Sequence, residues 1–265
     1  MTSMSRAMSK VRGFLEVIQF DNWLQLVISR LFFRPSIDIY YYRGLEILVD
    51  HAGGDVNGIR ACLVTPMYRQ FLDKMSLPKS GVNVVDLGAN SGGFSLLLKA
   101  EGLEVAKLVA AELNPQTYRR LVLNLERNFR DTEIVVLNEG IFSNSGSVEL
   151  YLGRGSTGDS IDSSATQNQH SKRYLIKTTT LNDFFENSVG ECIVSLCKID
   201  IEGAEWDLFF NPGSDRIRQC ENVLMEIHAK AGREPGQLVA RLANFGFELS
   251  GTKADVYWFT RNWSV

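Results

Sequence analysis

Five stretches of the chain are short, apolar and rich in Val, Ile and Leu, with polar or acidic residues at the end of each or directly after it. They span residues 82–86, 105–112, 133–141, 193–199 and 222–228. Continuous apolar runs of this length are typical of strands that are buried on both faces of a sheet. Helical patterns lie between them, for example at 94–98 and at 114–129, where a proline suits the first turn. The alternation predicts an α/β fold with a doubly wound, mostly parallel sheet.

The beginning of the chain has a different pattern. Between Met1 and Phe33, apolar residues recur at roughly helical spacing, and basic residues precede them. No apolar run here approaches the ~18 residues of a membrane span. We expect one or two helices that pack on the rest of the protein. The alternatives are a weak contact with a membrane surface and a contact between two copies of the chain.

Residues 36–50 contain two β-rich runs around a glycine, which predicts a β-hairpin. Residues 53–58 are rich in glycine and predict a loop, and a helix is expected from Thr65 onwards. We therefore interpret residues 1–80 as a helical and hairpin elaboration on a main domain at 81–265.

The second half of the main domain contains one long stretch without periodicity. Residues 145–152 suggest a hairpin extension, and 153–171 follow it, with Gly, Ser or Thr at ten of 19 positions. Long segments of this kind are often lids over functional sites, and we expect a lid over the substrate here. The remaining predicted elements are a capped helix at 178–185, a helix at 237–245 and two last strands at 247–249 and 256–260.

Composition excludes some classes of function. The chain has 265 residues, of which 45% are hydrophobic and 22% charged, and its net charge is −3. An acidic balance without a basic, aromatic-rich run gives no reason to expect nucleic-acid binding. The four cysteines are scattered without a Cys-x-x-Cys pair, which favours buried thiols in a reducing cytoplasm.

The turn after the first main-domain strand is the first candidate binding site. Asp86 ends the strand, and Gly88, Gly92 and Gly93 follow it with Asn90 between them. A strand, a glycine turn and a helix bring backbone close to a ligand. Asn90 stands where a dinucleotide fingerprint has its second glycine, and an acid is unfavourable beside a diphosphate. The acid suits a cationic ligand, and S-adenosylmethionine, with its ammonium and sulfonium groups, is one.

The next two strands add candidate contacts to the same ligand. Glu112 ends the second strand 24 residues after Gly88, and a carboxylate at about this distance accepts both ribose hydroxyls of an adenine nucleoside. Asn138 and Glu139 lie at the end of the third strand, where the adenine edge is expected in a doubly wound sheet.

A second chemical cluster follows the fourth strand. Lys198, Asp200 and Glu202 lie at its carboxyl end, where open α/β sheets bind their ligands. Glu226 and His228 end the next strand and share one of its faces. The plainest interpretation is structural, with Lys198 paired to one of the acids and His228 satisfied at the end of its strand.

Four motifs at 86–94, 112–115, 198–205 and 226–228 together resemble the FkbM-like methyltransferases, in the order expected for that family. The resemblance implies a Rossmann-like class I methyltransferase sheet with a closing antiparallel strand, and S-adenosylmethionine as cofactor. Together with the contacts inferred above, it implies a cofactor site made of Asp86, Gly88, Ala89, Asn90, Gly92, Phe94, Glu112, Leu113, Asn114, Asn138, Glu139 and Gly140. The chain departs from the family pattern at Leu113, where proline is usual, and at 138–140, where an apolar segment is more usual.

Similarity to this family also implies an O-methyltransferase that acts on a hydroxyl of a sugar, a polyketide or another small molecule. A hydroxyl is a poor nucleophile, so a base or a metal must remove its proton. The candidate catalytic residues are Asp200, Glu202, Glu226 and His228. In one arrangement His228 is the base, oriented by Asp200 or Glu226. In the other, Asp200, Glu226 and His228 hold Mg²⁺ or a transition metal.

Two other functions remain open at the level of sequence. An NAD-binding oxidoreductase would use the same type of sheet, but Asn90 and Asp86 disfavour it. A non-catalytic nucleoside-binding scaffold would need the glycine turn and Glu112, but it would not need Asp200 and His228.

Overall fold

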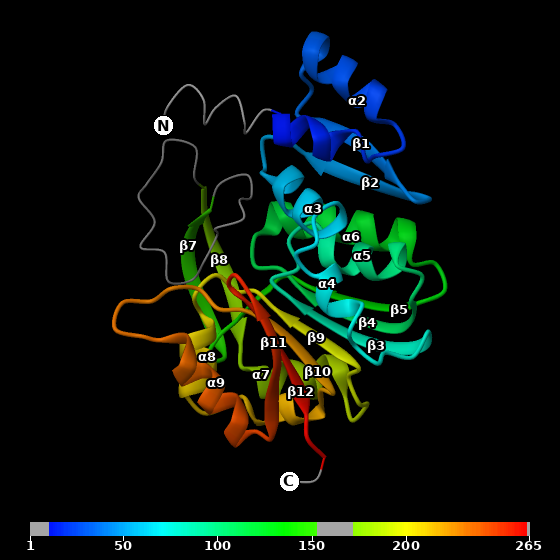
Figure 1. Ribbon diagram of the computed structural model, residues 1–265. Helices are drawn as coiled ribbons and strands as arrows, with labels where there is room; N and C mark the ends of the chain where they lie inside the picture. Colours follow the sequence, from blue (N-terminus) through cyan, green and yellow to red (C-terminus); the bar gives the residue numbers. More distant parts are fainter. Residues whose placement is uncertain (1–10, 153–171, 264–265) are drawn as a thin grey trace.

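A seven-stranded sheet forms the centre of the protein, for which a computed structural model describes residues 11–152 and 172–263 (Figure 1). Its strands, in chain order, are β3 (Ser80–Leu87), β4 (Glu104–Ala111), β5 (Glu133–Leu137), β9 (Leu196–Ile199), β10 (Asn222–Glu226), β11 (Phe247–Lys253) and β12 (Val256–Arg261). They are ordered β11-β12-β10-β9-β3-β4-β5. The five strands from β10 to β5 run parallel, whereas β12 is antiparallel to both β10 and β11. The predicted Rossmann-like sheet with its closing antiparallel pair is confirmed.

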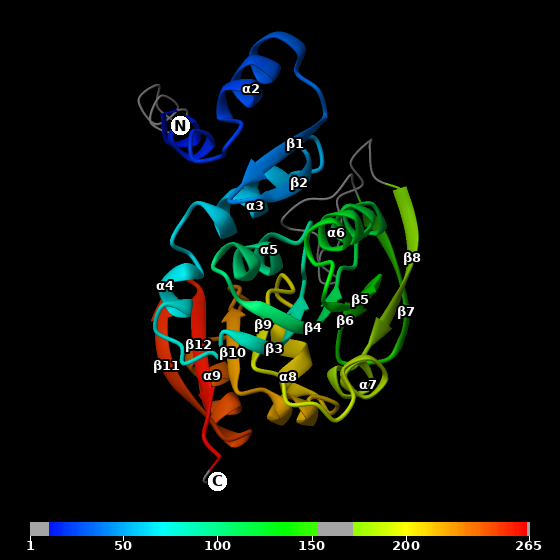
Figure 2. The ribbon, with the colours of Figure 1, turned by 90° about the vertical axis from the view of Figure 1, so that its right-hand side faces the viewer.

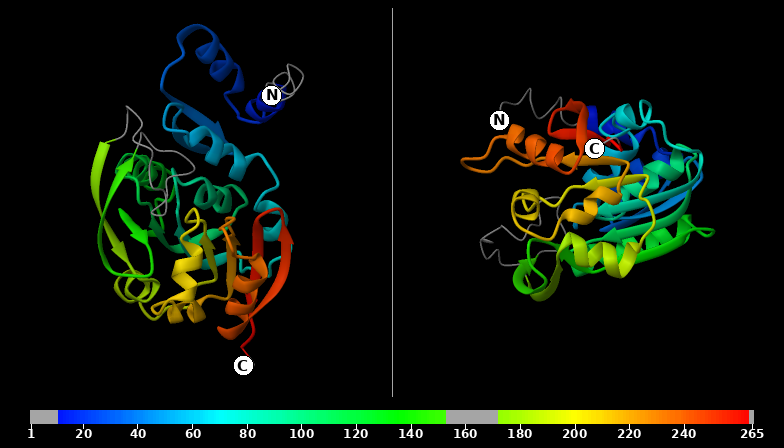
Figure 3. Two further views of the ribbon diagram at one scale, coloured as in Figure 1. Left: turned by 90° about the vertical axis from the view of Figure 1, so that its left-hand side faces the viewer. Right: turned by 90° about the horizontal axis from the view of Figure 1, so that it is seen from below.

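Helices cover both faces of this sheet (Figure 3). The main ones are α5 (Gly93–Ala100), α6 (Pro115–Asn128), α8 (Glu205–Phe210) and α9 (Pro235–Asn244). Val84 and Val85 are neighbours on β3, yet Val84 belongs to one buried core cluster and Val85 to the other. Since successive side chains point to opposite faces, a strand covered on both sides needs apolar residues on each face. Val82 and Val84 serve one core and Val85 and Leu87 the other.

A smaller sheet extends one end of the main sheet. It contains β6 (Glu139–Ile141), β7 (Gly146–Leu152) and β8 (Lys172–Thr179), in the order β6-β8-β7. The prediction of a single strand over 133–141 is wrong, because the chain leaves the main sheet at Asn138. The Asn138 side chain donates to the carbonyl oxygens of Glu112 (2.8 Å) and Leu113 (3.0 Å), and these bonds hold the break in place. The expected lid at 153–171 lies outside the described residues.

The capped helix expected after β8 is short. It is α7 (Leu181–Phe184), followed by the π-helical turn η2 (Phe185–Val189), and the 3₁₀ turn η3 (Asp215–Gln219) precedes β10. Thr180 caps α7, since its hydroxyl accepts the Asp183 backbone N–H.

The N-terminal residues form a layer on the α5–α6 face (Figure 2). Residues 11–17 are helical, and α2 (Trp23–Ile28), the π-helical turn η1 (Ser29–Phe33), β1 (Ile37–Tyr42) and β2 (Leu45–Asp50) follow. The predicted hairpin is confirmed, as β1 pairs with β2 in antiparallel register. Then come α3 (Asp55–Leu63) and α4 (Arg69–Leu72). Within the described residues, every helix is too short or too polar to span a bilayer.

The prediction of a loop at 53–58 is wrong from residue 55 onwards, because α3 begins at Asp55. The buried Asp55 carboxylate accepts the Asp50 backbone N–H (2.9 Å) and pairs with Arg120 of α6. These partners come from distant parts of the chain, so a local reading of a glycine-rich stretch does not reveal them. The same contacts join the first 80 residues to the main domain.

Candidate functional site

The turn between β3 and α5 is packed against the ends of two neighbouring strands. The backbone N–H groups of Gly88 and Ala89 both donate to the carbonyl oxygen of Ala111 at the end of β4, at 3.0 and 2.9 Å. On the other side, a Cβ added to Gly88 would lie 1.8 Å from the carbonyl oxygen of Asp200 after β9. Gly88 also has a φ of +71°. Only glycine meets both conditions.

We therefore expect Gly88→Ala to lower the free energy of unfolding by at least about 3 kcal/mol and to abolish cofactor binding. The methyl group overpacks the turn against Asp200 and also faces the left-handed backbone penalty. Gly81→Ala is the matched control, because Gly81 has a φ of +73° and no atom within 4 Å of its added Cβ. That variant is expected to lose only about 1–2 kcal/mol. Denaturant unfolding and ligand titration measure both quantities, and equal losses in the two variants would contradict the clash.

Glu112 connects the first turn to the start of α6. Its Oε2 accepts the Asn90 backbone N–H at 2.9 Å, and its Oε1 accepts the Asn114 backbone N–H at 2.8 Å. The side chain is 7% exposed and lines the pocket described below. Asn90 has a φ of +49°, an unusual conformation for a residue other than glycine. The turn is thus held in a strained conformation around the carboxylate predicted to bind ribose.

Asp86 lies beneath the turn and is fully buried. Its Oδ2 accepts the Ser95 hydroxyl at 2.7 Å, and its Oδ1 lies 3.6 Å from the Lys198 ammonium. Burial raises the pKa of Asp86, and the neighbouring Lys198 charge offsets only part of this rise. Asp86 does not line the pocket, and its predicted contact with a ligand ammonium stays a prediction.

Lys198 is a buried cation that lies between the carboxylates of Asp86 and Asp200. Its ammonium donates to the Gly88 carbonyl oxygen at 2.7 Å and lies 3.2 Å from Asp200 Oδ2. Burial lowers the pKa of Lys198, but the charges of Asp200 and Asp86 outweigh this and raise it above its ordinary value. Lys198 therefore stays charged and ties Asp200 to the first turn.

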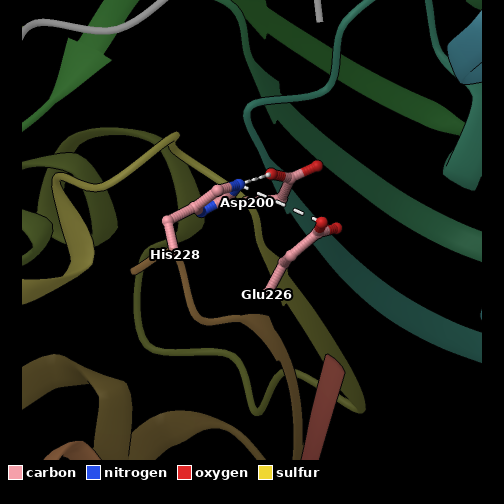
Figure 4. Close-up of side chains that lie close together, drawn as sticks. All are labelled: Asp200, Glu226 and His228. Atoms are coloured by element: carbon pink, nitrogen blue, oxygen red, sulfur yellow. Dashed lines mark ion pairs between the residues drawn. The ribbon is translucent and has the colours of Figure 1, made fainter. Parts of the chain in front are cut away.

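Asp200, Glu226 and His228 point toward one another at the carboxyl ends of β9 and β10 (Figure 4). The His228 Nε2 lies 3.8 Å from Asp200 Oδ1 and 4.0 Å from Glu226 Oε1. Glu226 is the last residue of β10, so His228 lies just beyond the strand and not within it as predicted. The three residues nevertheless lie close together, because β9 and β10 are parallel neighbours.

A residue to which the sequence assigned no role orients His228. Glu205 begins α8 and is fully buried. Its Oε1 accepts the Ile201 backbone N–H at 3.0 Å and lies 3.1 Å from His228 Nδ1. Asp200 and Glu226, which the sequence suggested for this role, both lie beside the opposite nitrogen, Nε2. Glu202 Oε2 lies 3.2 Å from His228 Nε2. The Glu202 backbone has a φ of +54°.

These carboxylates decide the protonation of the ring. Burial lowers the pKa of His228, but the contacts with Glu202 and Glu205 outweigh it and raise the pKa to about 11. Burial raises the pKa of Glu226 to about 7, with a further contribution from the charge of Asp200. The Tyr68 hydroxyl donates to Glu226 Oε2 at 3.3 Å. At neutral pH, His228 is an imidazolium, whereas Glu226 lies near its titration midpoint.

One group of side chains fits a divalent cation. Among the described residues, Asp200, Glu226 and His228 each offer a ligand atom, and these atoms lie within 4.8 Å of one another. Asp200 Oδ1 is buried and accepts no hydrogen bond from the described residues. An oxygen-rich set permits Mg²⁺, whereas the imidazole favours a transition metal.

A pocket of about 850 Å³, part of it open to solvent, joins the two clusters at the carboxyl ends of β3, β4 and β9. Ten of the predicted site residues line it: Gly88, Ala89, Asn90, Phe94, Glu112, Leu113, Glu139, Gly140, Asp200 and Glu202. Six do not: Asp86, Gly92, Asn114, Asn138, Glu226 and His228. The predicted binding and catalytic roles of all sixteen stay predictions.

Residues of the N-terminal layer also line the pocket, and the sequence did not indicate them. Gly58 and Cys62 come from α3, and Tyr68 lies just before α4. No motif marks these positions, since their approach to the pocket depends on how the layer packs. All four cysteines of the chain are free, and Cys62 is buried, which raises the pKa of its thiol.

A family model and a curated relative each match more than half of the chain. The family model described as "Methyltransferase FkbM domain" matches residues 86–249. A curated relative, the methyltransferase sdnD of Sordaria araneosa, is 26% identical over an alignment of 209 residues. The match covers 69% of this chain and 80% of the relative.

Solved structures are similar at low identity. The methyltransferase FkbM from Methylobacillus flagellatus KT has a TM-score of 0.43 and 19% identity, over 70% of this chain and 45% of that chain. Fibrillarin from Aeropyrum pernix, solved with natively bound S-adenosyl-L-methionine, has a TM-score of 0.43 and 13% identity, over 84% and 82% of the two chains. This chain therefore spans less than half of the Methylobacillus protein.

Proposed function

The chain belongs to the FkbM methyltransferase domain family, and from this premise we propose that it transfers the methyl group of S-adenosylmethionine to a hydroxyl oxygen of a small-molecule or glycan acceptor. The observation that carries the proposal is the pocket that joins Glu112 to the cluster around Asp200. Apolar walls that include Phe94 and Leu113, together with a few polar groups such as Glu112 and Asp200, are typical of a small-molecule site. We assign cofactor binding to the domain at 81–265, with the first 80 residues as an elaboration that completes one wall.

In this proposal, S-adenosylmethionine lies with its ribose at Glu112 and its methyl group toward Asp200. The Gly88 and Ala89 backbone forms the floor, and the adenine lies toward Leu113, Glu139 and Gly140. The acidic groups beside Asp200 favour a ligand whose reacting sulfur is positively charged. This orientation places the reactive carbon next to the groups that can accept a proton.

We assign the proton acceptor to Glu226. The acceptor oxygen attacks the methyl carbon as the carbon–sulfur bond breaks, S-adenosylhomocysteine leaves, and the hydroxyl proton passes to the Glu226 carboxylate. A base works best when its pKa is near the operating pH, and the Glu226 pKa of about 7 meets this condition. His228, with a pKa of about 11, already holds its proton at neutral pH, so it orders Glu202 and Asp200 instead.

The competing arrangement is a divalent cation held by Asp200, Glu226 and His228. When bound, such an ion would acidify the acceptor hydroxyl as a Lewis acid. His228 would then have to release its proton, because only neutral imidazole binds a metal. Base catalysis by Glu226 and metal assistance therefore differ in their response to a chelator.

The proposed base gives a defined pH dependence. Glu226 accepts a proton only when ionised, so we expect kcat to rise about tenfold per pH unit below its pKa of about 7 and to level off above it. Tyr68→Phe removes a hydrogen bond that stabilises the ionised Glu226 carboxylate. The pKa of Glu226 therefore rises, and the increase in kcat moves to higher pH. Initial rates measured between about pH 5 and 9 test both. A wild-type rate that is already level at about pH 5, as an ordinary glutamate pKa of about 4.3 would give, contradicts the assignment.

The activity itself is tested with methyl-labelled S-adenosylmethionine and a panel of hydroxylated sugars, polyketide fragments and lipid fragments, with and without EDTA. Label transferred to an oxygen, at a rate that EDTA leaves unchanged, supports the proposal in full. Transfer that EDTA stops and added metal restores replaces the Glu226 mechanism by the metal-assisted one. Binding of NAD without binding of S-adenosylmethionine would refute the proposed reaction.

A further inference from the structure

The segment formed by α2 and η1, residues 23–33, is apolar on nearly all sides. Eight of its eleven residues are large and apolar, yet only Leu26 is buried. The side chains of Leu31, Phe32 and Phe33 are 66%, 75% and 77% exposed. A helix that is hydrophobic all round is normally buried in a protein core or in a membrane. Exposed apolar surface of this kind marks an interaction site.

This segment lies at the end of the protein farthest from the main sheet, with the β1–β2 hairpin between them (Figures 1 and 2). Leu24, Ile28 and Phe33 line a shallow groove on it. The hairpin anchors this region, since the buried Phe20 packs on Tyr40 with ring centroids 4.8 Å apart and the Ser29 hydroxyl donates to Asp38 of β1. The apolar side chains of the groove remain exposed.

The described residues leave this surface uncovered. Trp23, Leu24 and Ile28 are 39%, 56% and 44% exposed, in addition to the three side chains given above. We therefore look for an occupant other than the described residues.

Charge indicates what that occupant is. The first 34 residues contain five basic and two acidic residues, a net charge of +3, whereas the whole chain carries −3. Arg30 and Arg34 end the apolar segment, and within the described parts of the chain neither forms an ion pair. In a two-fold dimer the same surface would face itself, so these arginines would repel each other. An anionic surface attracts them instead.

We propose that residues 23–33 dock on an anionic lipid surface, with Leu24, Ile28, Phe32 and Phe33 in the headgroup–acyl boundary and Arg30 and Arg34 at the lipid headgroups. Aromatic and branched apolar side chains beside arginines are the composition of helices that lie in the membrane interface. The inference rests on exposure and charge alone and is independent of the proposed methyl transfer.

The test is co-sedimentation of the full chain with two kinds of vesicle, one of phosphatidylcholine alone and one that also contains phosphatidylglycerol. We expect binding to the anionic vesicles, weakened at least tenfold by Phe32→Ser/Phe33→Ser and also reduced by Arg30→Gln/Arg34→Gln. Leu123→Ser/Leu175→Ser is the matched control, because these leucines are 54% and 70% exposed elsewhere on the surface. The control variant is expected to bind as the wild type does.

Three outcomes would overturn the proposal. The first is no binding to anionic vesicles by the wild type, and the second is equal loss in the control variant. The third is a stable dimer in light scattering that Phe32→Ser/Phe33→Ser dissociates while vesicle binding is absent, which would make a second copy of the chain the occupant. Because all substituted side chains are exposed, the variants are expected to fold, and thermal unfolding checks this.

Discussion

Glu226→Gln is expected to slow methyl transfer by about 10²–10⁴-fold while leaving the affinity for S-adenosylhomocysteine nearly unchanged. Glutamine keeps the shape and the hydrogen bond from Tyr68 but cannot accept the hydroxyl proton. Glu226 lies beside the pocket and not in its lining, so the cofactor site at Glu112 stays intact. Single-turnover rates with the acceptor found by the panel measure the first quantity, and calorimetric titration measures the second.

Glu186→Gln is the control for the loss of one negative charge, since Glu186 is exposed on η2. It is expected to keep the wild-type rate. A Glu226→Gln rate within tenfold of the wild type would show that another group accepts the proton. A large loss of cofactor affinity would instead assign Glu226 to binding. If EDTA has already stopped the wild-type reaction, the loss in Glu226→Gln reports a missing metal ligand.

The central sheet was predictable because burial on both faces leaves a direct trace in the sequence. Val84 and Val85 are consecutive and pack into different cores, so both positions are apolar although they point to opposite faces. The position of the pocket was predictable for a related reason. Gly88, Glu112 and Asp200 each follow a parallel strand, and the carboxyl ends of parallel neighbours lie at the same edge of the sheet.

Contacts between distant segments were not predictable in this way. Glu205 is one of several acids in its motif, and only the turn into α8 shows that it lies beneath the His228 ring. Tyr68 belongs to a segment without any recognisable motif, yet it lies beside Glu226. The place of Asp86 at the end of a strand suggested a ligand contact but did not indicate that the residue is fully buried beside Lys198. The local sequence pattern identifies the residues at the edge of the sheet, but it does not show how deeply each side chain is buried.

Lys198→Met is expected to lower the free energy of unfolding by about 3–5 kcal/mol, because it removes the cation from a buried group of charges. Asp86 is fully buried, and its Oδ1 has no hydrogen bond, so without Lys198 its charge lies uncompensated in the core. The Gly88 carbonyl oxygen also loses its donor at 2.7 Å. Denaturant unfolding measures the change, and it is expected to be larger than that of any exposed Lys→Met substitution, such as Lys172→Met.

The cause is separated from simple loss of packing by a second substitution and by pH. Asp86→Asn/Lys198→Met removes the stranded charge, so it is expected to be more stable than Lys198→Met alone. Burial already raises the folded-state pKa of Asp86 above its unfolded value, and loss of Lys198 raises it further. Stability from a raised carboxyl pKa is present at low pH and is lost as pH rises, so the deficit of Lys198→Met is expected to be smaller at about pH 5 than at about pH 8. A deficit that is independent of pH and equal in the double variant would mean that the aliphatic stem and the bond to Gly88, and not the charge of Asp86, account for the role of Lys198.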